Sequence, residues 1–538
     1  MYEVDLDRSL FPAQTDTAFQ ATTFAALLKD QADTRGDAMA LRELQENGDI
    51  GREWTYSDLL HDAEKLGRAL ASRHDRGARI AIMAHNLPEW ILMECGAAMA
   101  GLTIVTVNPA FNARELRYVL EQSQAEAIYF VPAVRGNPLE PIVDAACEEL
   151  DHIAHRILLT DHDVLFDGHD RGELRDTKPG NVVQIQYTSG TTGFPKGALL
   201  HQKGLIQNGF DIFQRWNAEA GESVVLAVPL FHTAGCAIIV CGGLSSGVTI
   251  LLAPGFDPVM IVKVIERERP ALAGGVPTML FGMIEAAEQT GCDVTSVKAL
   301  MCGGAMVAPE LSRKARTVFD APIQIVYGQT EASPGITYAW ADDAEEDLTG
   351  TIGQPLPHMD VAVLEPGGSV ICPTGEQGEI CVRGYNVMTG YNDNPEATAE
   401  TIDADGWLRT GDLGTMDARG YLKITGRVKE MIIRGGENLF PAEIENAMLE
   451  HPAIAEVAVV GVPDEKWGEL VACFMRAENG QQPTAEELKA FVRERLSPQK
   501  TPAHWIWVDE WPLTGSGKIR KFAMAEAFEQ GEYRASTA

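Results

Sequence analysis

Positive charge is scarce in this chain. Its 538 residues include 44 lysines and arginines against 77 aspartates and glutamates, which gives a formal net charge of −33. Nucleic acids and anionic membranes attract basic surfaces, so this balance argues against both as partners. The acidic excess is more simply interpreted as a solubility adaptation. Any polyanionic ligand would have to be bound by a few well-placed cations.

Paired cysteines are missing as well. None of the nine cysteines belongs to a CxxC motif, their number is odd, and several lie in apolar runs, around Cys95, Cys236 and Cys302. Reduced, buried thiols in the cytoplasm are the simplest interpretation. The N-terminal stretch MYEVDLDRSLFPAQ lacks the basic and apolar blocks of a signal peptide, which leads to the same expectation.

One uncharged stretch is nominally long enough to cross a bilayer. Thr233 to Ala253 has 21 residues without a charge. Its centre, GGLSSG at Gly242 to Gly247, favours a break between a buried helix and the buried strand VTILL. We therefore expect no transmembrane segment.

The order of predicted elements indicates an α/β protein. Length alone predicts about three structural units. From about residue 20 to 340, β-branched runs such as TIVTV (Thr103 to Val107) alternate with amphipathic stretches, which predicts stacked parallel sheets flanked by helices. Closely spaced strands with glycine and proline turns predict a small β subdomain at 351–425. We place the N-terminal domain at 1–426 and an α+β C-terminal domain at 427–538.

A loop rich in glycine and hydroxyl groups follows the apolar run VVQIQY. Its sequence, YTSGTTGFPKGA from Tyr187 to Ala198, combines four hydroxyls, three glycines and Lys196. Glycines let backbone amides approach phosphate oxygens, hydroxyls add donors, and lysine supplies a compact positive charge. A connector without a ligand is the alternative for such a loop taken alone. The Walker pattern is not matched, because Gly197 follows Lys196 where serine or threonine is required.

Further motifs follow in order along the chain. They are PLFHTAG at Pro229 to Gly235, YGQTEAS at Tyr327 to Ser333, TGD at Thr410 to Asp412, GRVKEMIIRGGENLFPAEIE at Gly426 to Glu445 and PLTGSGKIRK at Pro512 to Lys521. With these motifs, the chain resembles the adenylate-forming superfamily of acyl-CoA synthetases, luciferases and peptide-synthetase adenylation domains over nearly its whole length. The resemblance implies that ATP activates a carboxylic acid as an acyl adenylate and that CoA then accepts the acyl group.

The resemblance also assigns residues to the nucleotide. It implies ATP contacts by Thr188, Ser189, Gly190, Thr191, Thr192, Gly193 and Lys196 in the loop, by Gly303, Gly304, Ala305, Tyr327, Gly328 and Thr330 around the adenine, and by Asp412 and Arg427. Glu331 and Thr188 are the expected Mg²⁺ ligands, since this ion prefers oxygen donors. Without the resemblance, Glu331 would be interpreted as a helix N-terminal residue, Tyr327 as core and Asp412 as part of a common turn.

The two half-reactions require different residues in this family. Lys518 resembles the lysine that neutralises charge between carboxylate and α-phosphate, although its context alone would indicate a surface turn. Lys429 matches the hinge about which the mobile C-terminal domain moves before thiolysis. The residues expected to guide CoA are Arg434, Gly435 and Gly436. His232 matches a position that opens or closes the acyl channel, and a histidine satisfied in the core is an equal interpretation.

Small and apolar residues surround the expected acyl pocket. We expect the pocket to be formed by the helix after His232 and by Ala332, Ser333, Pro334 and Gly335, with no carboxylate to pair with an α-amino group. The chain most resembles medium- to long-chain fatty-acyl-CoA synthetases. An aryl, branched or short thioether acid ligase, an acyl-AMP ligase that loads a carrier protein, and a non-catalytic nucleotide-binding protein are the alternatives. Acyl chain length and a homodimer are left open.

Overall fold

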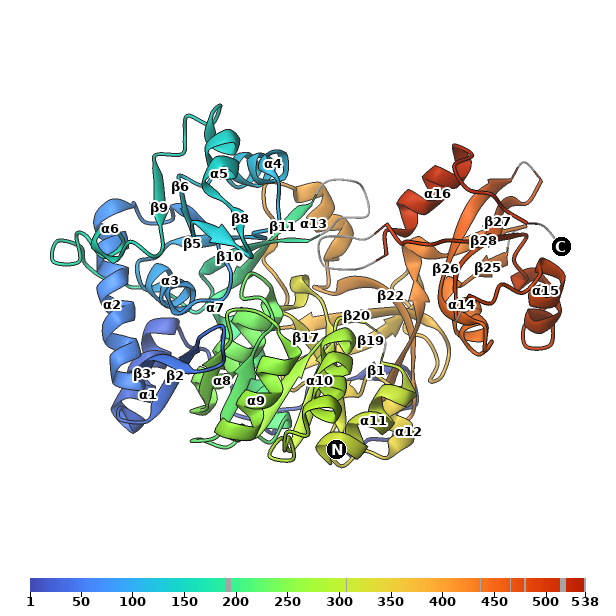
Figure 1. The fold of residues 1–538 in the computed structure, drawn as a ribbon, viewed down its shortest axis with the longest axis horizontal. Helices are drawn as coiled ribbons and strands as arrows, with labels where there is room; N and C mark the ends of the chain where they lie inside the picture. Colours follow the sequence, from blue (N-terminus) through green and yellow to red (C-terminus); the bar gives the residue numbers. More distant parts are fainter. Residues whose placement is uncertain are drawn as a thin grey trace.

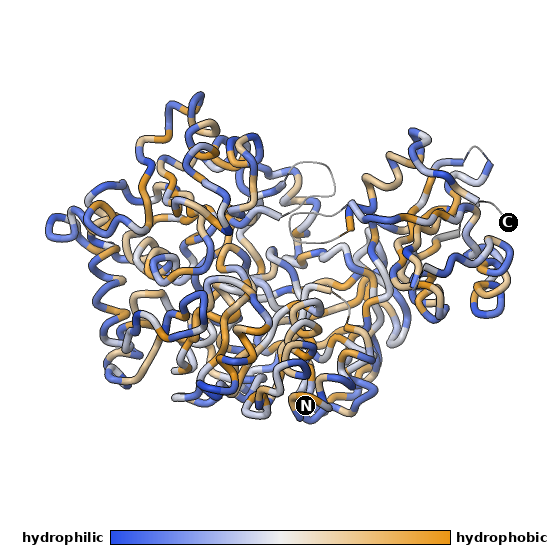
Figure 2. Tube along the Cα trace, viewed as in Figure 1, coloured by the Kyte–Doolittle hydropathy of each residue, from blue (hydrophilic) through white to orange (hydrophobic). Residues whose placement is uncertain are grey.

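The computed structural model describes residues 1–188, 195–305, 307–435, 437–464, 466–478, 480–512 and 519–536. The chain forms a broad N-terminal body and a smaller C-terminal lobe at one end of the long axis (Figure 1). Hydrophobic residues concentrate in the strands and helices inside both parts, whereas the outer loops are largely hydrophilic (Figure 2). The predicted α/β class is confirmed.

One mixed sheet carries the strands on either side of the predicted phosphate-binding loop. Its order is β21-β11-β10-β5-β4-β6-β9. The strands are β4 (Arg79–Met83), β5 (Thr103–Val107), β6 (Ala127–Phe130), β9 (His155–Leu158), β10 (Val182–Thr188), β11 (Lys196–His201) and β21 (Gly390–Tyr391). From β10 to β9 all neighbours are parallel, as expected of continuous apolar runs buried on both faces, whereas β11 and β21 are antiparallel.

A second mixed sheet has the order β18-β17-β16-β15-β14-β12-β13-β2-β3. Its strands are β2 (Met39–Leu44), β3 (Ile50–Thr55), β12 (Ser223–Leu226), β13 (Thr249–Leu252), β14 (Leu272–Gly275), β15 (Ala299–Gly303), β16 (Ile323–Gly328), β17 (Gly335–Tyr338) and β18 (Gln354–Pro355). From β2 to β16 the neighbours are parallel. The carboxyl ends of β15 and β16 therefore meet at one edge of the sheet, where ligands of α/β proteins commonly bind.

Helices alternate with these strands. They are α1 (Phe24–Arg35), α2 (Tyr56–Arg73), α3 (Pro88–Met99), α4 (Ala113–Ser123), α5 (Glu140–Cys147), α6 (His162–Leu165), α7 (Gln202–Arg215), α9 (Pro258–Glu268), α10 (Pro277–Thr290), α11 (Pro309–Phe319) and α12 (Glu345–Gly350), and a small hairpin joins β7 (Ala133–Val134) to β8 (Asn137–Pro138). Some of these helices begin at a clear sequence signal. Thr55 and Asp58 form a capping box at the start of α2. Every residue of α3 is buried.

The uncharged stretch Thr233 to Ala253 is broken, as predicted. It forms the π-helix η1 (Ala234–Cys241), the short helix α8 (Gly242–Ser246) and then β13. Gly247 separates the helix from the strand with a φ of +73°, in the left-handed region that favours glycine. Across the described residues, no helix combines the length and the apolarity that crossing a membrane requires.

An antiparallel sheet follows, with the order β1-β19-β20-β22-β23. Its strands are β1 (Leu10–Phe11), β19 (Met359–Leu364), β20 (Gly378–Gly384), β22 (Leu408–Met416) and β23 (Leu422–Arg427), with α13 (Pro395–Thr401) inserted before β22. The sheet thus recruits β1 from the start of the chain. Within 351–425, β18 and β21 pair with the two larger sheets instead, because short edge strands follow tertiary contacts more than sequence pattern.

The C-terminal lobe is a sheet covered on both faces. Its strands are β24 (Ile432–Arg434), β25 (Glu437–Leu439), β26 (Ile454–Asp464), β27 (Gly468–Ala477) and β28 (His504–Trp507), and its helices are α14 (Pro441–Leu449), α15 (Ala485–Arg493), η4 (Pro498–Lys500) and α16 (Lys521–Glu529). Val459 and Cys473 belong to a core with α14 and α15, whereas the adjacent Ala458 and Ala472 join a core with α16. Side chains of successive strand residues point to opposite faces, which places these helices on opposite sides.

Candidate active site

A carboxylate, a lysine and two hydroxyls meet at the ends of β10, β11, β21 and the 3-10 helix η2 (Thr330–Ala332) after β16. The Thr188 hydroxyl donates to Glu331 Oε1 at 3.3 Å, and the Tyr391 hydroxyl donates to the same oxygen at 2.8 Å. The Lys196 ammonium lies 5.0 Å from the centre of the Tyr391 ring. Residues from distant parts of the sequence, three of them predicted, therefore share one small site.

The oxygens at Glu331 fit a hard divalent cation that arrives with phosphate. Glu331 is buried, at 8% exposure, and its carboxylate lies beside the Thr188 hydroxyl. Within the described ranges, no cluster of three His, Cys, Asp or Glu side chains could hold a metal ion by itself. Mg²⁺ commonly keeps several waters and binds through one or two carboxylates plus substrate phosphates. A single carboxylate with a neighbouring hydroxyl is therefore a sufficient protein contribution.

A second polar cluster is centred on Asp412. Its Oδ2 accepts a hydrogen bond from the Tyr327 hydroxyl at 2.9 Å, and its Oδ1 lies 3.0 Å from Arg427 Nε. Asp412 and Arg427 meet because they are paired across β22 and β23. Burial and the charge of Asp412 raise the pKa of the Tyr327 phenol well above its usual range, so the phenol stays protonated and donates.

This cluster also contains a residue that we did not predict. The Asp412 amide donates to the Thr410 hydroxyl at 3.1 Å, and that hydroxyl donates to the Ile380 carbonyl at 2.7 Å. The TGD segment lies within β22 rather than in a separate turn, and Thr410 fixes it to the neighbouring strand β20. The motif contains this threonine, so its position was a usable signal.

Small residues lie at the strand ends near Tyr327. The predicted ones are Gly303, Gly304, Ala305, Gly328 and Thr330, which end β15 and β16 or follow them directly. A Cβ atom on Gly303 would lie 2.6 Å from Cγ1 of Val326, so the two strands are in close contact here. Gly304 and Ala305 are exposed at the strand end. Their expected place beside the adenine stays a prediction.

His232 lies two residues before the start of η1. Its carbonyl accepts hydrogen bonds from the Gly235 and Cys236 amides at 2.9 and 3.2 Å, so it starts the first helical turn. The ring is half-buried, with its centre 4.5 Å from that of Phe231. His232 therefore stands at the start of a buried apolar helix, where a gate and a core histidine are both compatible with the geometry.

A buried polar chain connects β10 with η1. Gln184 Nε2 donates to Glu94 Oε1 at 2.6 Å, while Gln186 Nε2 donates to Gln184 Oε1 at 2.9 Å and to Cys236 Sγ at 3.2 Å. Gln184 and Gln186 are two residues apart on one strand and so share a face. Burial raises the pKa of the Glu94 carboxyl well above its usual range, which favours the neutral acid.

Glutamine at position 94 is expected to change how stability depends on pH. A carboxyl whose pKa is higher in the folded than in the unfolded chain binds more protons when the chain is folded. The free energy of unfolding therefore falls as pH rises above the pKa of the unfolded chain. Above about pH 4.3, the wild type should lose stability relative to Glu94→Gln by up to about 1.4 kcal/mol per pH unit. Urea unfolding over a pH series measures this difference.

Glu89 on the same helix provides a control of opposite sign. Burial opposes its ionisation, but Arg52 outweighs burial and lowers the pKa of the Glu89 carboxyl. A carboxyl whose pKa is lower in the folded chain stabilises that chain at pH values above its unfolded pKa. This stabilisation is lost as pH falls. The wild type should therefore gain stability relative to Glu89→Gln as pH rises. Parallel trends for both variants would contradict a neutral Glu94.

Two of the residues predicted for CoA, Arg434 and Gly435, lie around Trp467 on the C-terminal lobe. The Gly435 amide donates to the Trp467 carbonyl at 2.7 Å, and Gly435 has a φ of +61°. A Cβ atom on Gly435 would lie 2.8 Å from Cε3 of Trp467, so only glycine allows this approach. Arg434 and Lys466 place their cations 6.0 and 4.9 Å from the Trp467 ring centre. Lys429 lies in the 3-10 helix η3 (Val428–Glu430), between β23 and β24.

Several predicted residues lie outside the part of the chain that the structure describes. They are Ser189, Gly190, Thr191, Thr192 and Gly193 in the loop, Gly436 in the C-terminal lobe, and Lys518. The described residues on either side of the loop are well anchored: the Tyr118 hydroxyl donates to the Pro195 carbonyl at 2.9 Å, one residue before Lys196. The roles of the residues in this list stay predictions from the motifs.

Known protein families match both parts of the chain. The AMP-binding enzyme family matches residues 28–392, and the AMP-binding enzyme C-terminal domain matches residues 443–518. The first match alone spans more than half of the sequence. The resemblance inferred from the motifs is thereby confirmed.

Individual proteins agree with the family match. YngI of Bacillus subtilis (strain 168) is 34% identical, over 94% of this chain and 97% of YngI. The medium-chain acyl-CoA ligase ACSF2, mitochondrial, of Mus musculus is 33% identical, over 97% of this chain and 90% of ACSF2. The structure of o-succinylbenzoate CoA synthetase (MenE) from Bacillus subtilis with the acyl-adenylate intermediate OSB-AMP has a TM-score of 0.79 at 26% identity, covering 93% of this chain and 97% of MenE. The chain belongs to the AMP-binding enzyme family and is an ATP-dependent acyl-CoA ligase that acts through an acyl adenylate.

Proposed function

We propose that this ligase activates a medium- or long-chain fatty acid and transfers its acyl group to CoA. The segment that follows His232 carries the proposal. η1 and α8, with the sequence AGCAIIVCGGLSS, contain no charged side chain and are buried almost throughout. A pocket bordered by such a segment favours an uncharged, apolar acyl group. The ACSF2 relative, a medium-chain acyl-CoA ligase by name, supports the same class of acid.

In the first half-reaction, we assign the two polar clusters to different parts of ATP. Lys196 and Lys518 serve the phosphates, where their positive charges reduce repulsion between the carboxylate and the nucleotide. Glu331 and Thr188 would hold Mg²⁺, which would neutralise phosphate charge when bound. Asp412 and Arg427 bind the ribose side of the nucleotide. The hydrogen bond from Tyr327 to Asp412 fixes the orientation of this carboxylate.

In the second half-reaction, we assign the CoA path to the C-terminal lobe. We place the domain boundary at η3, so that rotation at Lys429 carries Arg434 and Gly435 toward the adenylate. Trp467 then forms one wall of a narrow passage, because it already lies against the backbone of Gly435. His232 gates the acyl channel on the opposite side.

Asparagine at position 412 is expected to weaken ATP binding. The change keeps the volume of the side chain but removes the negative charge that accepts hydrogen bonds from sugar hydroxyls and pairs with Arg427. Loss of one charge-assisted hydrogen bond corresponds to an increase of about tenfold in the KM for ATP. Steady-state kinetics with varied ATP give this value.

Asp360→Asn is the matched control for this prediction. Asp360 forms an ion pair with Arg383 at 2.9 Å on strands β19 and β20 of the same sheet. The control should keep the wild-type KM for ATP. A similar increase in both variants would indicate a general loss of charge and would contradict the assignment of Asp412 to the nucleotide.

A panel of carboxylic acids tests the choice of substrate. Release of AMP and pyrophosphate is measured with ATP, Mg²⁺ and CoA, for straight-chain acids from acetate to palmitate and for benzoate. We expect the highest kcat/KM with an aliphatic acid longer than acetate. Highest activity with benzoate would favour the aryl-acid alternative. The similarity to MenE, an o-succinylbenzoate CoA synthetase by name, is the reason to include this acid. Adenylate formation without transfer to free CoA would favour loading of a carrier protein.

We also propose a reducing compartment, with the cytoplasm as our choice. All nine cysteines are free, and those on β15, β20 and β27 are buried. Burial raises the pKa of the Cys302 thiol to about 12, which keeps it protonated and unreactive. Fractionation of cells that produce the protein from its own gene would locate it.

A further inference from the structure

Tyr391 links the two sides of the phosphate site. The pairing of β21 with β11 sets it opposite Ala198, two residues after Lys196. Its hydroxyl donates to Glu331 Oε1 at 2.8 Å, and its ring centre lies 5.0 Å from the Lys196 ammonium. One side chain therefore contacts both the carboxylate and the lysine that we assign to MgATP.

The hydrogen bond determines which oxygen of Glu331 remains for a ligand. The Thr188 hydroxyl also donates to Oε1, at 3.3 Å. Among the described residues both hydroxyl donors use this one oxygen, so Oε2 is left for a cation. The backbone of Glu331 is held as well, because its carbonyl accepts from the Met388 amide at 2.9 Å. Glu331 is thus held both at its side-chain carboxylate and at its backbone.

The phenol of Tyr391 is a permanent donor. A tyrosine phenol ordinarily keeps its proton at physiological pH, and in this contact it donates to the Glu331 carboxylate. A hydrogen bond to an ionised carboxylate is shorter and stronger than one between neutral groups. The contact is therefore suited to fix a carboxylate that must remain negative.

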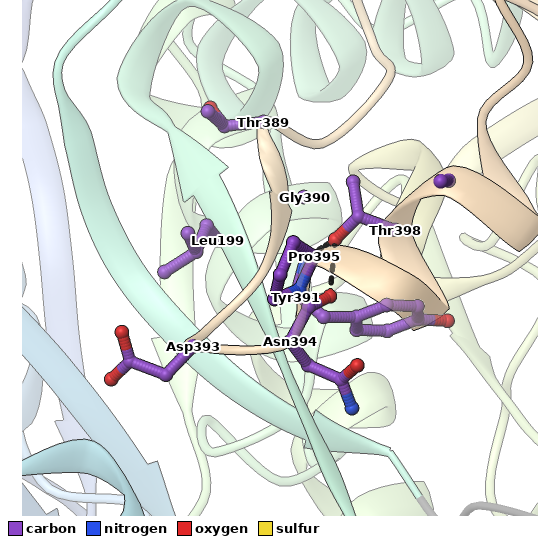
Figure 3. A pocket seen from close by; sticks show the side chains of 9 residues that line it. Leu199, Thr389, Gly390, Tyr391, Asp393, Asn394, Pro395 and Thr398 are labelled. Carbon is purple, nitrogen blue, oxygen red and sulfur yellow. Dashed lines mark hydrogen bonds between the residues drawn. The ribbon is translucent and has the colours of Figure 1, made fainter.

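The start of α13 fixes Tyr391 in turn. The Tyr391 amide donates to the Thr398 hydroxyl at 2.9 Å, and this hydroxyl donates to the Asn394 carbonyl at 2.8 Å (Figure 3). Asn394 caps α13 by accepting a hydrogen bond from the Ala397 amide at 3.0 Å. An open surface pocket of about 410 Å³ lies beside this turn, with Tyr391 in its wall. The backbone of Tyr391 is thus held independently of its contact with Glu331.

We propose that Tyr391 is a positioning residue for MgATP, which orients Glu331 toward the cation and holds the Lys196 ammonium next to the same site. The inference rests on the proposed function, because that function makes Glu331 and Lys196 ligands of MgATP. It extends the function to a residue outside the motifs that define the nucleotide site. The defect expected of a Tyr391 variant is specific: binding of the metal-bound nucleotide is weakened, and binding of metal-free ATP is not.

Calorimetric titration of ATP into Tyr391→Phe tests this role without turnover. The variant keeps the ring beside Lys196 and removes only the hydroxyl. In the presence of Mg²⁺ we expect the Kd for ATP to rise about tenfold, as loss of a hydrogen bond to a charged group predicts. In EDTA the Kd should equal that of the wild type. Thr398→Val, which removes the hydroxyl that holds the Tyr391 amide, should raise the Kd in Mg²⁺ in the same direction but less.

Tyr421→Phe is the matched control. The Tyr421 hydroxyl donates to the buried carboxylate of Asp343. Tyr421 directly precedes β23 and Arg427 ends that strand, so the variant loses a bond of the same kind away from the site. Its Kd should not change in either buffer. An unchanged Kd for Tyr391→Phe in Mg²⁺, or an equal increase in Mg²⁺ and EDTA, would overturn the proposal. A wild type that bound MgATP yet formed no AMP with any acid would instead refute the proposed function. The ratio of the Kd values of Tyr391→Phe and wild type, in Mg²⁺ and in EDTA, would still decide the role of Tyr391.

Discussion

Replacing Lys518 with alanine is expected to abolish adenylation and to leave thiolysis of a supplied acyl adenylate largely intact. The lysine ammonium neutralises charge that develops between the carboxylate and the α-phosphate, and this charge exists only in the first half-reaction. Removal of one such stabilising group costs at least about a hundredfold in rate. Exchange of labelled pyrophosphate into ATP measures the first half-reaction, and release of AMP from synthetic acyl adenylate plus CoA measures the second.

Lys423→Ala is the matched control for Lys518→Ala. Lys423 is exposed on β23, so its replacement removes the same charge from a surface strand. Both half-reactions should keep their wild-type rates in this control. Wild-type pyrophosphate exchange in Lys518→Ala, or equal loss of both half-reactions, would contradict the role of Lys518.

Proline at position 429 is expected to spare the first half-reaction and to block the second. Lys429 lies in the 3-10 helix η3, and the φ typical of such a helix is close to the value that proline imposes. Rotation of the C-terminal lobe requires backbone angles near this residue to change, and proline prevents that at φ. The same two half-reaction assays measure the effect, with loss of thiolysis expected to exceed any loss of adenylation by about tenfold or more.

Lys429→Ala separates stiffness from charge. It removes the same ammonium group and leaves φ free, so it should retain both half-reactions. Melting temperatures of the two variants verify that the fold is kept. If Lys429→Ala lost thiolysis as completely as Lys429→Pro, the side chain rather than the hinge would be responsible, and the account of Lys429 would be wrong.

The fold class and the proximity of Thr188 to Glu331 could be predicted because their signals are local. Runs such as TIVTV and VVQIQY are uncharged and rich in β-branched residues, which is typical of buried strands. The end of such a strand places Thr188 at a sheet edge, and the motif YGQTE places Glu331 at the end of another. Their hydroxyl and carboxylate are 3.3 Å apart in the structure. Pattern and motif together therefore predicted that these two side chains meet, while their role at the nucleotide stays a prediction.

Tyr391 could not be predicted in the same way. It belongs to the two-residue strand β21, which has no periodicity of its own, and its partner Ala198 on β11 is nearly two hundred positions away. Pairing of so short a strand depends on the surrounding tertiary structure. The following helix cap at Asn394 was a local signal for a turn, but it gave no information about which carboxylate the tyrosine would contact.

Glu94 illustrates a different limit. The helix PEWILMECGAAM has apolar residues on every side, which predicts a helix buried all round. A glutamate in such a helix must either find a partner or lose its charge. The sequence could raise this question but could not identify Gln184 as the donor, because β10 and α3 are joined only by the packing of the sheet against the helix. Trp467 beside Gly435 is a similar case in the C-terminal lobe.

A crystal structure with Mg²⁺ and a nonhydrolysable ATP analogue tests the central claim most directly. That claim is that two lysine-bearing loops, more than three hundred residues apart in the sequence, act on one nucleotide. We predict that the ammonium groups of Lys196 and Lys518 both lie within hydrogen-bonding distance of the same triphosphate, with Glu331 at the cation and Asp412 at the ribose. A nucleotide bound elsewhere, or one that contacts Lys196 while no domain arrangement brings Lys518 to its phosphates, would contradict it.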